Sequence, residues 1–264
     1  GRVDGLVLPE LAVDSATYQA AVEAFVQHAD VKLQFFVAGA FGRTSKRNKA
    51  MTTIFSAEAK DIVAVSGQSK HHRWKLDRAQ ITQYSLGAAL DPESEWWEDV
   101  SVSERDIPLY LFRRGACFTT LICEDLARAE PGQRVIRAIG PNLVIALLMD
   151  GPQLASRWPG RYAMGLADDP GSAVLSVTSL GLVRRSNYHF GGTHREVALW
   201  RDGSGVTRSL HLPPGKHALL LSVTRHRRTE YTLDGRSDHK SAYELMLSGC
   251  VPIAVPNPPP WVRD

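Results

Sequence analysis

The sequence predicts an α/β protein whose sheets mix parallel and antiparallel strands. Short apolar segments alternate with helix-like segments through the middle of the chain, which is typical of parallel strands joined by helices. Elsewhere, pairs of apolar segments are joined by short polar turns, which indicates antiparallel hairpins. With 264 residues, of which 44% are hydrophobic, the chain is long enough for one large domain with a substantial core.

The sequence of the first 65 residues predicts one helix and several strands. The helix is expected from Ser15 to Ala29, because Ser15 suits a helix cap and apolar residues then recur at helical spacing. Pro9 is expected to end the first strand, because proline lacks the N–H that a sheet needs. The basic run at residues 43–49 predicts the tip of a hairpin. The predicted strands are Gly5 to Pro9, Leu33 to Phe41, Met51 to Phe55 and Ile62 to Val65.

The rest of the chain predicts strands and helices in alternation, followed by antiparallel strands. The clearest helix runs from Pro131 to Ile139, with Gly140 just beyond it, which is the usual placing of both residue types. Residues 91–104 are polar and predict an excursion over the surface. The other predicted helices are Asp77 to Tyr84, Trp158 to Ala167 and Asp238 to Leu247, before a proline-rich tail at residues 255–260. The other predicted strands are Ile107 to Phe112, Cys117 to Cys123, Leu143 to Leu148, Ala173 to Thr178, Glu196 to Trp200, Thr207 to Leu212 and His217 to Val223.

Composition argues against several classes of function. The formal net charge is only +3, so no strong field selects nucleic acid. No apolar run reaches the roughly 18 residues of a membrane span, and no signal peptide is visible. The three cysteines do not form a disulfide framework, which favours a reducing, cytoplasmic compartment. No Cys or His spacing predicts a metal site, and no cofactor is implied.

Three apolar segments end in polar residues that can do chemistry. Glu10 follows the first segment, Lys70 follows the segment that starts at Ile62, and Cys123 follows a strongly apolar run. Sites of α/β proteins are built at such strand ends. A thiol has an ordinary pKa of about 8.5, so at neutral pH it is mostly protonated and needs a base.

Each of these residues also has a plainer interpretation. A single cysteine is more often an inert core thiol than a nucleophile. Glu10 alone would be a surface acid at a strand end, and Lys70 alone would be solvated. Glu124 and Asp125, which follow the cysteine, either bind substrate or hydrogen-bond to the backbone of the turn, and the sequence favours neither.

The order of these three residues resembles the nitrilase, or carbon–nitrogen hydrolase, superfamily through most of the chain. Glu10 in Leu-Pro-Glu-Leu looks like the family's base, Lys70 in Lys-His-His like its lysine, and Cys123 in Leu-Ile-Cys-Glu-Asp like its nucleophile. His72 stands two places after the lysine, as the family's histidine does, whereas Lys75 does not fit this spacing. Residues 158–167, 176–181 and 190–192 resemble the helix, strand and loop that follow in the family.

The resemblance implies a four-layer α-β-β-α sandwich with two mixed sheets. It also implies thiol-dependent hydrolysis of a non-peptide carbon–nitrogen bond in a small amide or nitrile, with no metal or cofactor. Cys123 would form a thioester-type intermediate, with Glu10 as the base. Lys70 and the backbone N–H of Glu124 would stabilise the developing negative charge. The expected substrate-binding residues are Glu124, Gln80 and His72.

Two features depart from the family's pattern. The family opens with a strand and a helix before its Pro-Glu motif, so this unit is expected to be missing or to lie upstream of Gly1. The family also often carries a second glutamate after the lysine, and the matching position holds Gln80, which keeps hydrogen bonding but loses the charge. We therefore expect a nitrilase-like domain at residues 1–235, followed at residues 236–264 by a C-terminal helix and the proline-rich tail.

A second hypothesis is that the chain is a nitrilase-like scaffold or partner-binding module. Nitrilase-like domains occur behind reverse transcriptase domains in bacterial antiviral proteins, and the chain is similar to such a domain. Its partners would then be the upstream domain of the same polypeptide and nucleic acid, whereas a separate enzyme would form a homo-oligomer. Neither hypothesis implies a membrane. A papain-like protease is disfavoured, because no histidine stands in a recognisable arrangement with a cysteine.

Overall fold

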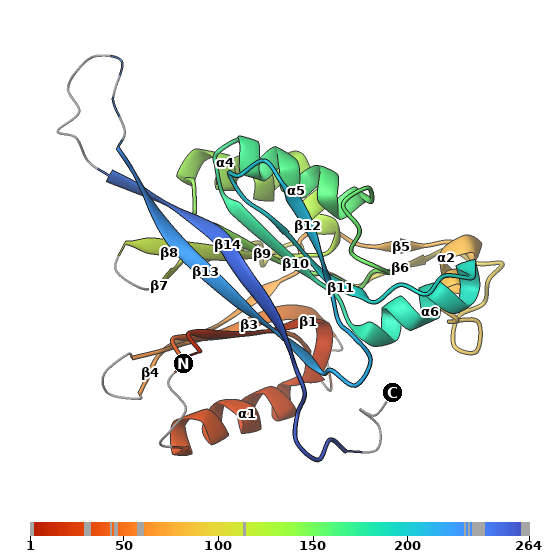
Figure 1. Ribbon diagram of the computed structural model, residues 1–264. Helices are drawn as coiled ribbons and strands as arrows, with labels where there is room; N and C mark the ends of the chain where they lie inside the picture. The colour runs from red at the N-terminus through yellow and green to blue at the C-terminus, as the bar shows by residue number, and fades with distance from the viewer. Residues whose placement is uncertain are drawn as a thin grey trace.

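A four-stranded mixed sheet supports the first two candidate site residues (Figure 1). Its strands lie in the order β1 (Gly5–Asp14), β2 (Phe35–Phe41), β3 (Asn48–Phe55) and β4 (Ile62–Ser69). β1 runs parallel to β2, whereas the other neighbours are antiparallel. The computed structural model describes residues 3–28, 33–42, 44, 47–56, 61–112, 115–229, 231, 233 and 241–259, so the expected hairpin tip at 43–49 lies partly outside the described residues.

A six-stranded mixed sheet supports the cysteine. Its strands lie in the order β12 (Thr207–His211), β11 (Glu196–Arg201), β10 (Ala173–Val177), β9 (Leu143–Leu147), β8 (Ala116–Ile122) and β7 (Tyr110–Phe112). The central strands β8, β9 and β10 are parallel, and the outer pairs are antiparallel. The predicted α/β class with mixed sheets is therefore confirmed.

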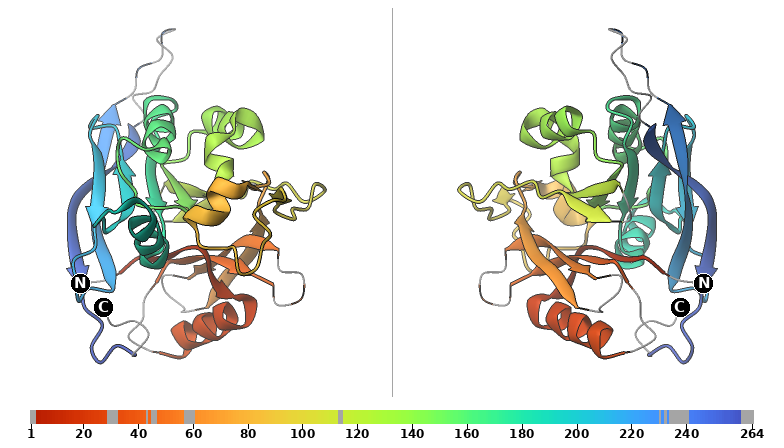
Figure 2. Two further views of the ribbon diagram at one scale, coloured as in Figure 1. Left: turned by 90° about the vertical axis from the view of Figure 1, so that its right-hand side faces the viewer. Right: turned by 90° about the vertical axis from the view of Figure 1, so that its left-hand side faces the viewer.

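Three hydrophobic clusters join the layers of the fold. Figure 2 shows α1 (Ser15–Gln27) on the outer side of the first sheet. This helix packs Tyr18 against Phe36 on one face of the first sheet. Phe35, the residue before Phe36, points to the other face and contacts Phe118 between the two sheets, as strand alternation requires. Helices α4 (Arg134–Ile139) and α5 (Trp158–Asp168) cover the far face of the second sheet.

The shorter elements surround the strand ends. They are β5 (Lys75–Leu76), α2 (Arg78–Gln83), β6 (Trp96–Trp97), α3 (Glu124–Ala127), a π-helical turn at Ala129–Gln133 and α6 (Leu180–Phe190). The helix expected from Pro131 is thus divided, and α4 ends at Gly140, whose φ of 66° is left-handed. Helix α6 was not predicted, because its sequence is mostly polar and few of its side chains are buried. Within the described residues, no helix is long and apolar enough to cross a bilayer.

The C-terminal helix expected from Asp238 to Leu247 is wrong. Residues 238–240 lie outside the described part of the chain, and the following residues form β14 (Ser241–Ile253), antiparallel to β13 (Ala218–Thr229). The residue types favour a helix, but Leu245 and Leu247 are both buried in the cluster between the sheets. This period-two burial along a paired strand overrides the helical preference of the residues.

The first strand does not end at Pro9 as expected. β1 continues to Asp14, but its pairing with β2 shifts between Leu8 and Val13. Proline cannot donate to the ladder, and the irregular stretch after it holds Glu10. The neighbouring strand approaches closely here, because a Cβ on Gly39 would lie 2.4 Å from the Cα of Glu10. Glycine at position 39 therefore makes room for the bulge that presents Glu10.

Candidate active site

Glu10 and Lys70 form a buried ion pair. Lys70 follows the last residue of β4, and its Nζ lies 3.0 Å from Oε1 of Glu10. Both side chains are only 1% exposed. Sequence reasoning predicted that these residues meet, and the structure brings them together across two strands of the same sheet. A pair this deeply buried is stable only when both charges are well matched by hydrogen bonds.

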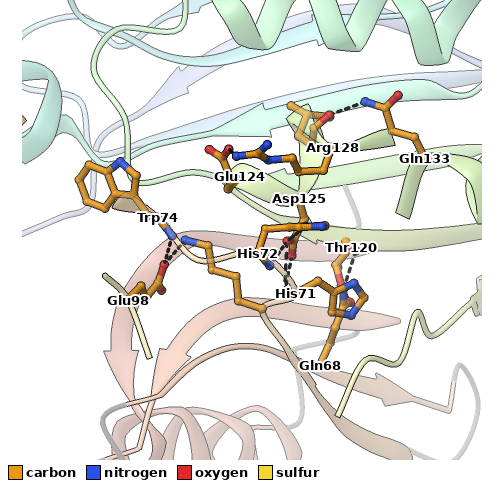
Figure 3. A network of polar contacts seen from close by, with 12 residues as sticks. Gln68, His71, His72, Trp74, Glu98, Thr120, Glu124, Asp125, Arg128 and Gln133 are labelled. Carbon is orange, nitrogen blue, oxygen red and sulfur yellow. Dashed lines mark hydrogen bonds and ion pairs between the residues drawn. The ribbon is translucent and has the colours of Figure 1, made fainter. Parts of the chain in front are cut away.

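Two further residues complete this pair, and sequence reasoning missed both. Oε2 of Glu98 lies 2.6 Å from Nζ of Lys70. The side-chain amide of Asn48 donates to Glu10 at 2.6 Å and to Glu98 at 2.9 Å. The backbone N–H of Trp74 also donates to Glu98, at 3.3 Å (Figure 3). Residues 91–104 were expected to be a surface excursion, and the one signal to the contrary was a glutamate directly after two tryptophans.

The pKa of Lys70 shows that this environment favours the ammonium form. Burial by itself lowers the pKa of Lys70. The charges of Glu10, Cys123 and Glu98 act in the opposite direction and raise the pKa above its ordinary value. Lys70 is therefore a fixed positive charge at neutral pH.

Cys123 stands at a strained turn between β8 and α3. Its φ of 44° and ψ of −104° are unusual for a residue with a side chain. The backbone is held by its own N–H, which donates to the carbonyl of Leu147 on the adjacent strand at 2.8 Å. The side chain is buried, at 7% exposure. The turn directs the chain from the carboxyl end of a parallel strand into a helix, where sites of α/β proteins are found.

The thiol and the Glu10 carboxyl influence each other's ionisation. Burial raises the pKa of the Cys123 thiol well above its ordinary value, and the charge of Glu10 raises it further. Lys70 and the backbone of Met149 lower this pKa, with the smaller effect. Burial also raises the pKa of Glu10, against the charge of Lys70. Glu10 is therefore a stronger base than an exposed glutamate.

One oxygen of Glu10 remains available for a proton. Oε1 accepts hydrogen bonds from Lys70 and Asn48. Oε2 is buried and has no hydrogen-bond partner among the described residues. A buried oxygen without a partner is costly in an inert site, but a general base needs such an oxygen to receive a proton.

A pair of side-chain hydrogen bonds fixes the two large sheets at the site. The side-chain amide of Gln68 donates to the carbonyl of Thr120 at 3.1 Å, and the Thr120 hydroxyl donates back to Gln68 at 2.5 Å (Figure 3). Gln68 lies two residues before Lys70, and Thr120 lies three residues before Cys123. This exchange sets the position of the lysine relative to the cysteine.

His72 and the two acids after Cys123 have structural partners. Asp125 is buried, and it accepts hydrogen bonds from the backbone N–H groups of His71 and His72. Nδ1 of His72 also lies 2.9 Å from Oδ1 of Asp125 (Figure 3). Glu124 pairs instead with Arg128 one helical turn later, at 2.5 Å. Asp125 thus ties the loop after Lys70 to the turn after Cys123, which answers the question left open by the sequence for this acid.

The side chain of Gln80 bonds to the backbone at the start of its own helix. It accepts a hydrogen bond from the backbone N–H of Asp77 at 3.2 Å, and Asp77 caps Gln80 in return at 3.0 Å. This is a capping box at the start of α2. The acid that lies beside Lys70 is Glu98, and the substrate-binding role expected of Gln80 stays a prediction.

A second polar cluster acts on Cys123 through the charge of Asp150, which raises the pKa of the thiol. Asp150 is buried and lies 2.9 Å from the guanidinium of Arg157. The hydroxyl of Tyr84 donates to Asp150 at 3.3 Å. Burial raises the pKa of Tyr84, and the charges of Asp150 and Cys123 raise it further, so the hydroxyl stays protonated at neutral pH. Sequence reasoning identified none of these three as a site residue.

Solved structures similar to this chain include nitrilase-superfamily members, although no protein-family model and no curated protein matches the sequence. A nitrilase-superfamily amidase from Nesterenkonia is 16% identical, with a match that covers 81% of this chain and 75% of the amidase at a TM-score of 0.47. A branch 10 member of the superfamily from Saccharomyces cerevisiae is 12% identical, and its match covers 78% and 71% at a TM-score of 0.45.

A third similar structure is a glutamine-dependent NAD+ synthetase from Acinetobacter baumannii, which is 14% identical and matches 80% of this chain at a TM-score of 0.47. The chain spans only 37% of that synthetase. Because all these identities and TM-scores are low, the similarities assign neither an activity nor a residue role to this chain.

The cluster at Cys123 contains the parts of a thiol-dependent reaction. Lys70 supplies a fixed positive charge, and Glu10 supplies a basic oxygen without a partner. Within the described part of the chain, no group of three or more His, Cys, Asp or Glu side chains could hold a metal ion.

Proposed function

We propose that this protein hydrolyses a non-peptide carbon–nitrogen bond, in an amide or a nitrile, with Cys123 as nucleophile, Glu10 as base and Lys70 as the stabilising cation. The observation that supports this most is the buried Glu10–Lys70 pair, whose charges both act on the Cys123 thiol. As part of the proposal, the order of α1, two sheets and outer helices corresponds to a nitrilase-like four-layer α-β-β-α sandwich.

The first half-reaction releases the amine. Oε2 of Glu10 takes the thiol proton while Sγ of Cys123 attacks the amide carbon, and the carbonyl π electrons move onto oxygen. Lys70 and the backbone N–H of Glu124 stabilise this oxyanion, and the loss of one such donor typically costs about 3 kcal/mol in barrier. When the carbonyl re-forms, the C–N bond breaks and its electron pair goes to nitrogen. The nitrogen takes the proton from Glu10 and leaves a thioester on Cys123.

The second half-reaction restores the thiol. Water attacks the thioester carbon, and Glu10 takes a water proton. The C–S bond then breaks, and the thiolate recovers that proton from Glu10. With a nitrile substrate, Sγ attacks the nitrile carbon and the nitrogen takes the thiol proton from Glu10, which leaves a thioimidate on Cys123. A first water adds to that carbon and ammonia leaves, which gives the thioester that the second water hydrolyses.

The raised pKa of the Cys123 thiol is compatible with these reaction steps. The resting thiol is neutral, so it has to lose its proton during the attack and not before it. A glutamate with a raised pKa beside a permanently charged lysine suits that transfer, because the base is stronger than usual and its charged form is still compensated. In this proposal, Glu10 accepts the thiol proton, and Lys70 supplies the positive charge that compensates the ionised glutamate.

Ammonia release from a panel of small amides and nitriles tests the proposal, with intact-mass analysis after mixing. Turnover by the unmodified protein, with an acyl mass on Cys123, is the expected result. Both signals should be absent in Cys123→Ala, and turnover should fall at least about a hundredfold in Glu10→Gln. Turnover that survives in Cys123→Ala would overturn the proposal.

Partner binding without catalysis is a second candidate function. The edge strands β4 and β7 expose apolar side chains, including Val63 at 65% and Leu111 at 76%. These edges lie next to each other, because Ser66 and Tyr110 hydrogen-bond. Such a surface suits another protein segment, either in the same polypeptide or in a second copy. Attachment to a reverse transcriptase, and with it a nucleic-acid partner, stays a prediction.

A further inference from the structure

The residues that follow Lys70, together with Glu98, help to line a pocket of about 600 Å³. Its lining comes from three separate segments of the chain: the loop after β4, the loop after β6 and the end of α3. Each segment contributes one arginine, and these are Arg73, Arg105 and Arg128. The volume is in the range of small-molecule sites.

The acids of this pocket are already paired with other cations. Glu98 pairs with Lys70 at 2.6 Å, and Asp99 pairs with Arg47 at 3.4 Å. Neither Lys70 nor Arg47 lines the pocket. The acids therefore do little to offset the positive charge of the pocket's own arginines.

Two of the three arginines have no acidic partner in the described part of the chain. Arg128 pairs with Glu124, but no described carboxylate lies within ion-pair distance of Arg73 or Arg105. The guanidinium of Arg73 lies over the ring of Trp97, 5.0 Å from its centroid. Stacking holds the guanidinium plane while its N–H groups remain able to donate.

We propose that this pocket binds the phosphate or carboxylate group of a small molecule, with Arg73 and Arg105 as the main ligands. Guanidinium groups match these oxyanions in charge and in the spacing of their donors. The anion would belong either to the substrate itself or to a separate metabolite. The proposal does not depend on the proposed hydrolysis, because binding can be measured without turnover.

Titration of the full chain with inorganic phosphate, followed by calorimetry and by NMR, tests the proposal. Saturable binding should weaken about tenfold in Arg105→Gln, because a charged hydrogen bond is lost. It should weaken further in the double variant Arg73→Gln/Arg105→Gln. The matched control is Arg134→Gln, which removes the same charge from an exposed pair with Glu130 outside this pocket and should change the affinity less than about twofold.

Arg105→Gln also serves if the double variant fails to fold, since Arg105 is exposed. Absent phosphate binding, or equal weakening in Arg105→Gln and Arg134→Gln, would overturn the proposal.

The rate of Cys123 alkylation by iodoacetamide identifies the source of the anion. Slower alkylation in saturating phosphate assigns the anion to the substrate, and an unchanged rate assigns it to a separate metabolite.

Discussion

Oε2 of Glu98 lies 2.6 Å from Nζ of Lys70, so the buried lysine is held between two carboxylates. With both acids ionised, the cluster has one more negative charge than positive charge. Burial, and to a lesser extent the charge of Glu98, raise the pKa of Glu10, whereas burial and the charge of Glu10 raise the pKa of the Cys123 thiol. The arrangement makes Glu10 a good proton acceptor and keeps the resting thiol neutral.

Glu98→Ala should lower the free energy of unfolding by roughly 1–3 kcal/mol, because it removes a charged hydrogen-bond partner from a buried lysine. The matched control is Glu95→Ala, since Glu95 is 65% exposed and pairs with Lys75 on the surface. The control should change stability by less than about 0.5 kcal/mol. Urea denaturation measures both, and equal losses would show that Lys70 does not need its second carboxylate.

The strain at Cys123 predicts an unusual order of stability between two variants. Within a regular helix or strand, a glycine variant normally has a free energy of unfolding roughly 0.5–1 kcal/mol lower than the alanine variant. At a φ of 44°, Cys123→Gly should instead be the more stable of the pair. Cys117 lies within a regular strand, so Cys117→Gly should be less stable than Cys117→Ala in the same denaturation experiment. The same order at both positions would argue against strain at the turn.

Asp125→Asn should destabilise the protein by roughly 2 kcal/mol or more, because Asp125 is buried and accepts from two backbone N–H groups. An asparagine would turn a donor towards one of these N–H groups or towards His72. The loss should appear as a lower urea midpoint with an unchanged slope. A midpoint within error of the wild-type value would mean that Asp125 does not tie the two loops together.

The raised thiol pKa predicts how stability changes in alkaline solution. The folded state holds the thiol proton more tightly than the unfolded chain does, so this contribution is complete below the ordinary thiol pKa and is lost as pH rises towards the raised value. Cys123→Ser removes this titration and leaves the other two cysteines in place. The difference in unfolding free energy between wild type and Cys123→Ser should be constant from about pH 6 to 8 and fall above about pH 9. A difference that grows with pH would contradict the burial of the thiol.

The sequence was enough to predict the residues that local pattern places at strand ends. Lys70 and Cys123 directly follow β4 and β8, whereas Glu10 lies within β1, which continues past its predicted end at Pro9. Helix α2 with its cap at Asp77 was also predictable, because capping depends on residues close in sequence.

The parts that the sequence did not reveal depend on contacts between distant segments. Glu98 reaches Lys70 from a polar loop with no periodicity, and Asp150 reaches Tyr84 across 66 residues. Strand β14 forms although its residues prefer a helix, because the extended conformation buries both Leu245 and Leu247 in the core. Local pattern carries no information about such long-range partners.

Alkylation by iodoacetamide at neutral pH, mapped by mass spectrometry, tests the central claim most directly. Cys123 is the buried cysteine, whereas Cys117 and Cys250 are partly exposed, so access alone would make Cys123 the slowest to react. If Glu10 activates its thiol, Cys123 should instead react first, and that advantage should disappear in Glu10→Gln. Slow labelling of Cys123, at or below the rate of the other two and unaffected by Glu10→Gln, would contradict a working nucleophile.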